Sequence, residues 1–79
     1  MARVLLFGRL SDVAGWRERS VDAPFLSALR AKLAGEDAAL GEALAGKGVQ
    51  VALDQVIVRG DAPLNAATEV AFLPPMSGG

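Results

Sequence analysis

The chain has 79 residues with no cysteine and no histidine, and its 8 lysines and arginines nearly balance its 9 aspartates and glutamates, for a net charge of −1. This inventory excludes disulfides, thiolate or imidazole metal sites, cysteine nucleophiles and Ser-His triads, and it leaves no basic block for nucleic acid. The length supports one small domain, with no signal peptide and no apolar run near the roughly 20 residues that span a bilayer. We therefore expect a cytoplasmic domain that binds neither nucleic acid nor membrane and holds no metal or cofactor of its own.

The first quarter of the chain predicts a hairpin with an elaborated turn. The short stretch 3–7, which is apolar from Val4 to Phe7 and bounded by Gly8, is typical of a strand that is buried on at least one face. Apolar residues spaced by three and four over 9–15 predict one or two helical turns closed by Gly15. The stretch 16–21 carries the polar residues expected of an edge strand.

The middle of the chain predicts the main helix and a weaker second one. Asp22 is a candidate N-cap and Pro24 is tolerated only in the first helical turn, and we expect Gly35 to end the helix. Between these ends lies an apolar stripe: Phe25, Leu26, Leu29 and Leu33. Residues 36–45 repeat the pattern weakly, and Gly41 in their middle lowers helix propensity by about 1 kcal/mol relative to alanine.

The remainder changes to the period of two that is typical of strands. Residues 49–53 alternate, and 56–58 follow across a tight turn at Asp54 and Gln55, which predicts a hairpin. A loop of turn-forming residues separates this hairpin from the last strand, 69–73. The order of these elements indicates the α+β class with a ubiquitin-like β-grasp fold, a mixed five-stranded sheet with one main helix packed on one face.

Strand parity predicts which side chains face the helix. Two residues of the first strand and two of the last share one parity and are expected to face Leu29 and Leu33: Val4, Leu6, Val70 and Phe72. If these strands are neighbours, the opposite parity lines the uncovered face: Leu5, Phe7, Ala71 and Leu73. We interpret Phe7 and Leu73 on that face as a docking surface for a partner protein. The alternatives are that the short helices or a loop cover these side chains, or that they are ordinary scattered exposed apolar residues.

The C-terminus departs abruptly from the strand pattern. After the domain of residues 1–73 we expect an extended arm of six residues: Pro74, Pro75, Met76, Ser77, Gly78 and Gly79. Its two prolines lack amide donors and favour an extended conformation, so they stop the strand and fix an exit direction. Its two glycines have no side chain, so the end is thin enough for a narrow active site. The reactive group would be the terminal carboxylate of Gly79.

This ending, together with residues 4–10 and 62–64, resembles the small subunit of molybdopterin synthase, the sulfur carrier of molybdenum cofactor biosynthesis, over essentially the whole chain. That family ends in a strand followed by Pro-Pro, a variable residue, Ser or Thr, and Gly-Gly, and residues 69–79 match this pattern throughout. Two turns depart from the family: residues 67–68 are Ala-Thr where Gly-Asp is usual, and Asp54 stands where Asn is usual.

The resemblance implies a sulfur relay in which the chain is not an enzyme by itself. A ubiquitin-activating-like adenylyltransferase would use ATP to adenylate the Gly79 carboxylate, and a persulfide donor would replace the AMP to leave a thiocarboxylate. Residues 74–79 would enter the large catalytic subunit of molybdopterin synthase, which is expected to hold the pterin precursor. Two related roles stay open, a thiamine-pathway sulfur carrier and a ubiquitin-like protein modifier. A purely structural binding module is a third reading, and it leaves the Gly-Gly terminus unexplained.

Overall fold

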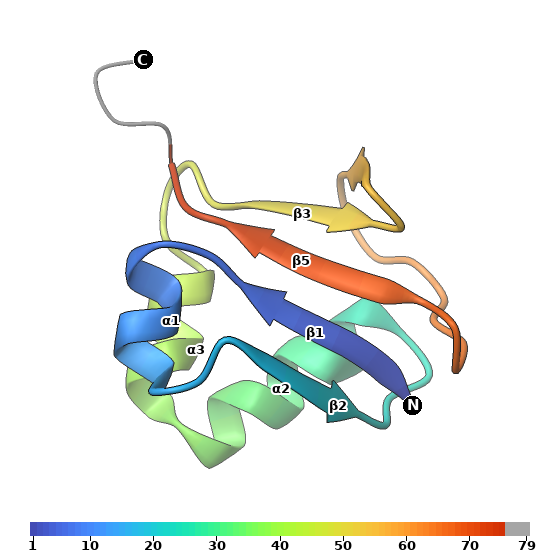
Figure 1. The fold of residues 1–79 in the computed structure, drawn as a ribbon, viewed down its shortest axis with the longest axis horizontal. Helices are drawn as coiled ribbons and strands as arrows, with labels where there is room; N and C mark the ends of the chain where they lie inside the picture. The colour runs from blue at the N-terminus through green and yellow to red at the C-terminus, as the bar shows by residue number, and fades with distance from the viewer. Residues whose placement is uncertain (76–79) are drawn as a thin grey trace.

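The computed structural model describes residues 1–75, so the predicted arm residues Met76, Ser77, Gly78 and Gly79 lie outside the described part. Within it, strands and helices follow the predicted order (Figure 1): β1 (Ala2–Leu6), α1 (Arg9–Ala14), β2 (Glu18–Val21), α2 (Leu26–Glu36), α3 (Ala38–Leu44), β3 (Gln50–Leu53), β4 (Val56–Val58) and β5 (Glu69–Leu73).

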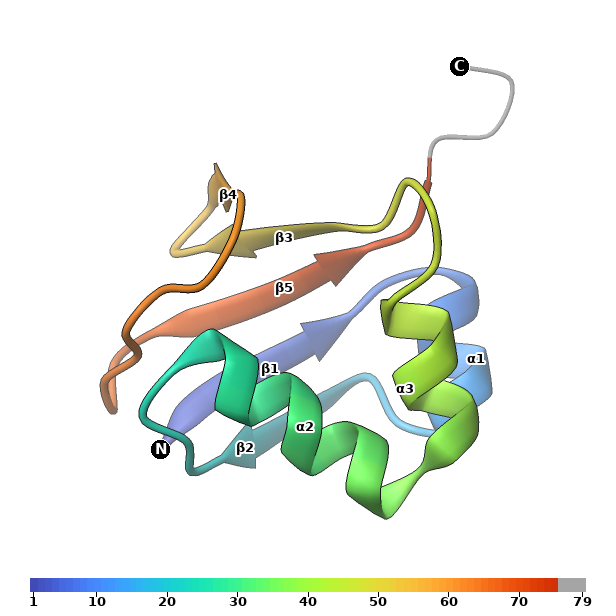
Figure 2. The same cartoon turned by 180° about the vertical axis from the view of Figure 1, so that it is seen from behind.

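The five strands form one mixed sheet in the order β2-β1-β5-β3-β4. The first and last strands, β1 and β5, are parallel neighbours, whereas the other pairs are antiparallel. Helices α2 and α3 lie across one face of the sheet, and α1 packs beside α3 (Figure 2). The predicted α+β β-grasp architecture is therefore confirmed, with two short helices beside the main one.

The register of the two central strands confirms the predicted parity. Val4 pairs with Val70 and Leu6 with Phe72, and all four side chains are buried in one core with Leu29 and Leu33. The opposite parity contains the half-buried Leu5 and Leu73 and the exposed Phe7. Ala71 on that face is only 6% exposed, because it is small and its neighbours in the register are Leu5 and Ala52.

Helix α2 begins later than the sequence predicts. Phe25 is the N-cap residue and makes no side-chain capping bond, so Pro24 precedes the helix and Asp22 does not cap it. The capping oxygens come instead from Asp61 in a distant loop, which accepts hydrogen bonds from the backbone N–H and the hydroxyl of Ser27, each at 2.7 Å. The predicted cap is wrong because the sequence offers local candidates only, whereas the fold supplies a carboxylate from elsewhere.

The end of α2 and the start of α3 also differ from the prediction. The helix continues through Gly35, and Asp37 then caps α3 by accepting a hydrogen bond from the backbone N–H of Leu40 at 3.2 Å. Gly41 has a packing role, because a Cβ at this position would lie 2.5 Å from the Cβ of Ala34. The glycine that weakens α3 as an isolated helix therefore allows α3 to approach α2 closely.

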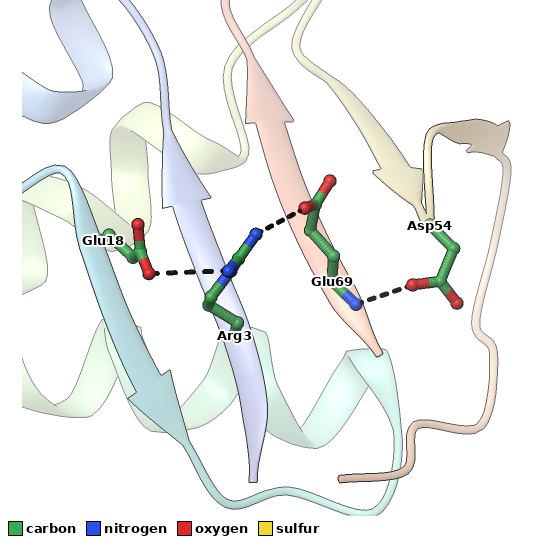
Figure 3. Close-up of polar contacts among 4 residues, drawn as sticks. All are labelled: Arg3, Glu18, Asp54 and Glu69. Carbon is green, nitrogen blue, oxygen red and sulfur yellow. Dashed lines mark hydrogen bonds and ion pairs between the residues drawn. The ribbon is translucent and has the colours of Figure 1, made fainter. Parts of the chain in front are cut away.

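The two turns that depart from the family pattern are hydrogen-bonded. Asp54 and Gln55 form the predicted tight turn with positive φ angles of 49° and 71°, typical of a two-residue hairpin loop. The Asp54 carboxylate accepts a hydrogen bond from the backbone N–H of Glu69 at 2.9 Å (Figure 3). In the other turn, Thr68 accepts one from the N–H of Asn65 at 2.9 Å through its hydroxyl. Asp54 thus anchors the start of β5, and Thr68 closes the turn that leads into it.

Candidate functional site at the root of the arm

Three segments converge where β5 ends. Because β1 and β5 are parallel, they end at the same side of the sheet (Figure 1), and the backbone N–H of Phe7 donates to the carbonyl of Phe72 at 3.3 Å. On the other side of β5, Gln50 pairs with Leu73. The segment Leu73–Pro75, called here the arm root, therefore leaves the sheet between the β1–α1 and α3–β3 connections.

The two prolines of the arm root each lie against a glycine. A Cβ at Gly8 would lie 3.1 Å from Cγ of Pro74, and a Cβ at Gly48 would lie 2.8 Å from Cβ of Pro75. Gly8 follows β1 and Gly48 precedes β3, so the contacts come from separate segments. Neither contact could be predicted from the sequence, since nothing local to either glycine indicates that a proline lies beside it.

Beside the arm root, an apolar strip crosses the sheet face that the helices leave uncovered. The register places Leu5, Ala71, Ala52 and Ile57 in one row on four strands. Phe7 and Leu73 extend this row toward the arm root, and Phe7 and Ile57 are 45% and 46% exposed. We call these six residues the open face: Leu5, Phe7, Ala52, Ile57, Ala71 and Leu73. The structure thus brings the two predicted contact residues together, whereas their binding to a partner stays a prediction.

The other end of the same sheet face is charged. Arg3 forms ion pairs with Glu69 at 2.8 Å and with Glu18 at 3.6 Å (Figure 3). The Arg3 side chain is 54% exposed, so these pairs contribute little to stability, about 0–1 kcal/mol each. They nevertheless mark a boundary, because the apolar half of the face adjoins the arm and the charged half lies away from it.

A partly buried arginine packs against the end of β5 from the helix side. The guanidinium of Arg30 lies 5.3 Å from the ring centroid of Phe72 and donates to the carbonyl of Leu44, the last residue of α3, at 3.3 Å. Burial lowers the pKa of Arg30 from its ordinary value. This side chain links the end of α3, from which the Gly48 connection departs, to the residue that precedes Leu73.

The arrangement offers a binding surface and an exit path. A hollow of about 520 Å³ between α1 and α3 reaches Pro75 and has Arg9, Glu42 and Lys47 on its lining. Residues 1–75 contain no cluster of three or more His, Cys, Asp or Glu side chains that could hold a metal ion. None of the helices within this part of the chain has the length and hydropathy of a membrane span. The expected absence of a bound cofactor and the cytoplasmic location stay predictions.

Comparison with known proteins places the chain in a family. Residues 4–79 match the ThiS family. The chain is 35% identical over 81 residues to the molybdopterin synthase sulfur carrier subunit of Escherichia coli K12, a match that covers 100% of both chains.

Solved structures show the same fold. SAMP1 of Haloferax volcanii has a TM-score of 0.80 and 26% identity, with 99% of this chain and 98% of that one covered. Small archaeal modifier protein 1 of Methanosarcina acetivorans has a TM-score of 0.86 and 20% identity, with 99% and 95% covered, and its likeness shows the fold alone. The resemblance predicted from the sequence is confirmed by the two sequence matches, and the chain belongs to the ThiS family.

Proposed function

We propose that the chain is the sulfur carrier subunit of molybdopterin synthase and that it delivers sulfur from the Gly79 carboxyl group to the pterin precursor of the molybdenum cofactor. The observation that carries this proposal is the full-length match to the Escherichia coli sulfur carrier subunit. The arm sequence supports it, because Pro-Pro-Met-Ser-Gly-Gly presents a carboxylate with no bulky side chain beside it.

The chemistry requires an activating enzyme. A terminal carboxylate has a pKa of about 3.5, so at neutral pH it is a stable anion and a poor electrophile. A ubiquitin-activating-like adenylyltransferase attaches AMP from ATP to Gly79 and releases pyrophosphate. A persulfide donor then attacks the carbonyl carbon and displaces AMP, and a thiol cleaves the resulting S–S bond, which leaves the thiocarboxylate and a disulfide. The large synthase subunit supplies the pterin site and the catalytic side chains, so the chain itself is a sulfur-donating arm and not an enzyme.

The open face supplies the docking contact in this proposal. Four residues follow Pro75, and at 3.3–3.6 Å each they reach about 14 Å at most, so a partner that acts on Gly79 must approach the arm root closely. Phe7 adjoins that root and Leu73 belongs to it, and both side chains present apolar surface. Burial of such surface is favourable at about 25 cal/mol per Å², and it would align the arm with the partner's active site.

Intact-mass spectrometry tests the proposal. The full chain is incubated with ATP, an activating enzyme and a persulfide donor, and we expect a gain of about 16 Da from exchange of one oxygen for sulfur. Addition of the large synthase subunit and the pterin precursor should return the mass to its original value. Reactions without ATP are the control, and a chain that gains no mass in the complete mixture contradicts sulfur carriage.

A second candidate function is protein modification, which the likeness to SAMP1 of Haloferax volcanii, at 26% identity, favours. In that role Gly79 would form an isopeptide bond with lysines of target proteins. Mass spectrometry of cell extracts for lysines joined to the C-terminal segment of this chain distinguishes the two. A thiamine-pathway sulfur carrier would load sulfur in the same way, but it would not return to its original mass with the molybdopterin synthase subunit.

A further inference from the structure

Among residues 1–75, two glycines combine a positive φ angle with a contact to the arm root. Gly8 has a φ of 57° and Gly48 a φ of 86°, and Cβ atoms at these positions would meet Pro74 at 3.1 Å and Pro75 at 2.8 Å. A separation below 3.0 Å forces a displacement, and the atom met by the Gly48 Cβ belongs to a rigid ring bonded to the backbone.

Two other glycines provide an internal comparison. Gly15 and Gly60 both have a φ of 82°, yet a Cβ at either position would meet nothing within 4 Å. Backbone conformation alone is therefore a sufficient reason for glycine at positions 15 and 60. At positions 8 and 48 the adjacent prolines impose a second requirement, which is space.

We propose that Gly8 and Gly48 are positioning residues that form a two-sided seat for Pro74 and Pro75 and thereby set the direction in which the arm leaves the domain. The prolines are stiff, and the glycines allow the backbones on both sides to approach them closely. Each proline lies against a different connection, Pro74 against the one that follows β1 and Pro75 against the one that precedes β3, so the arm root is held by two separate segments. We call the four residues the proline seat.

The seat has a consequence for sulfur transfer, and this consequence rests on the proposed function. A displaced arm root presents Gly79 to the activating enzyme in the wrong place, and misplacement by 1 Å can reduce a rate by as much as about a hundredfold. We therefore expect Gly48→Ala to lower the kcat/KM with which the activating enzyme uses this chain as substrate by about tenfold, equivalent to 1.4 kcal/mol.

A spin-label experiment tests the seat without using the activity. The chain lacks cysteine, so Ala31→Cys on the exposed side of α2 and Ser77→Cys in the arm give two unique label sites. We expect Gly48→Ala, and to a lesser degree Gly8→Ala, to shift or broaden the label–label distance distribution. Gly60→Ala and Gly15→Ala impose a similar φ constraint away from the arm, so they should lower Tm without changing the distribution.

A double substitution keeps the test valid if Gly48→Ala is strongly destabilised. Pro75→Gly removes the Cβ that the new methyl group meets, so adding Gly48→Ala to Pro75→Gly should change the distance distribution no more than Gly60→Ala does. The proposed seat is contradicted if Gly48→Ala matches Gly60→Ala in distance distribution and kcat/KM. It is also contradicted if Gly48→Ala still changes the distance distribution in the Pro75→Gly background. A wild-type chain that never gains sulfur contradicts the proposed function instead, while the distance comparison still decides the seat.

Discussion

The carboxylate of Asp61 holds the first turn of α2 from 34 residues away, because its two oxygens accept hydrogen bonds from the backbone N–H and the hydroxyl of Ser27. Oδ1 also accepts one from the N–H of Ala62 at 2.9 Å. These bonds favour the charged form, so they lower the pKa of Asp61 from its ordinary value of 3.8, the side-chain bond from Ser27 being the largest cause.

Asp61→Ala should destabilise the domain at neutral pH and matter less in acid. Because the pKa of Asp61 is lower in the folded state, its carboxylate stabilises the fold at pH values above the unfolded-state pKa. This stabilisation is lost as the pH falls through the folded-state pKa. The Tm difference between the wild type and Asp61→Ala should therefore be largest near pH 7 and shrink below about pH 4. Asp22→Ala, at the cap predicted from sequence, is the control and should change Tm less. A constant difference from pH 7 to pH 2 contradicts the account.

Alanine substitutions at the two helical glycines Gly35 and Gly41 should change stability in opposite directions. At Gly35 a Cβ meets nothing within 4 Å, so Gly35→Ala should stabilise by up to about 1 kcal/mol through helix propensity. At Gly41 the Cβ would lie 2.5 Å from that of Ala34, and the overpacking cost of about 1–3 kcal/mol outweighs the same gain. Thermal unfolding should show a higher Tm for the first and a lower Tm for the second, and equal shifts would refute close packing of α2 on α3.

A charge on the open face should weaken partner binding while the fold persists. Phe7 is 45% exposed, so Phe7→Glu should leave circular dichroism unchanged. In the complex the charge would be buried without a partner, and a cost of about 3 kcal/mol weakens affinity for the large synthase subunit more than a hundredfold. Leu73→Glu should have the same effect on binding, with a lower Tm because Leu73 is half-buried.

Phe25→Glu is the matched control for Phe7→Glu, because Phe25 is 49% exposed and precedes α2, outside the open face. It should bind the large subunit as the wild type does. Folded Phe7→Glu protein that binds normally would show that the open face is not the contact, and unfolded protein would show that Phe7 belongs to the core.

Removal of Gly79, or extension of the chain beyond it, should abolish sulfur loading with no change in Tm. Loading should be lost because the carboxylate must lie at one fixed distance from the sheet. Tm should not change because the altered residues follow the arm root and lie outside the domain of residues 1–73. Intact mass after the complete loading reaction provides the measurement, and a shortened chain that still gains about 16 Da disproves the role of the terminus.

Gly78→Val should block transfer through side-chain volume. A β-branched side chain widens the arm and restricts its backbone angles, so loading and delivery should both fall by at least about tenfold while Tm is unchanged. Gly78→Ala is the graded control and should retain more activity. Normal delivery by the valine variant would show that the partner's channel is not narrow.

The sequence predicted features of the fold that depend on local pattern and missed those that depend on distant partners. Periodicity identified the strands and their buried faces, and the Asp54-Gln55 turn followed from its position between two apolar runs. The capping role of Asp61, the packing role of Gly41 and the contacts of Gly48 each involve a residue on another element. No periodicity reports such pairs, because one chain segment carries only half of each contact.

The parallel pairing of β1 with β5 makes the centre of the sheet from segments at opposite ends of the domain, Ala2–Leu6 and Glu69–Leu73. Their register requires closure of a loop of more than sixty residues, so the central contact is non-local and slows folding relative to a helical bundle. During synthesis, β1 has no central neighbour until β5 has emerged from the ribosome. A chain that ends before Val70 lacks the buried side chains of Val70 and Phe72, so it cannot complete the core.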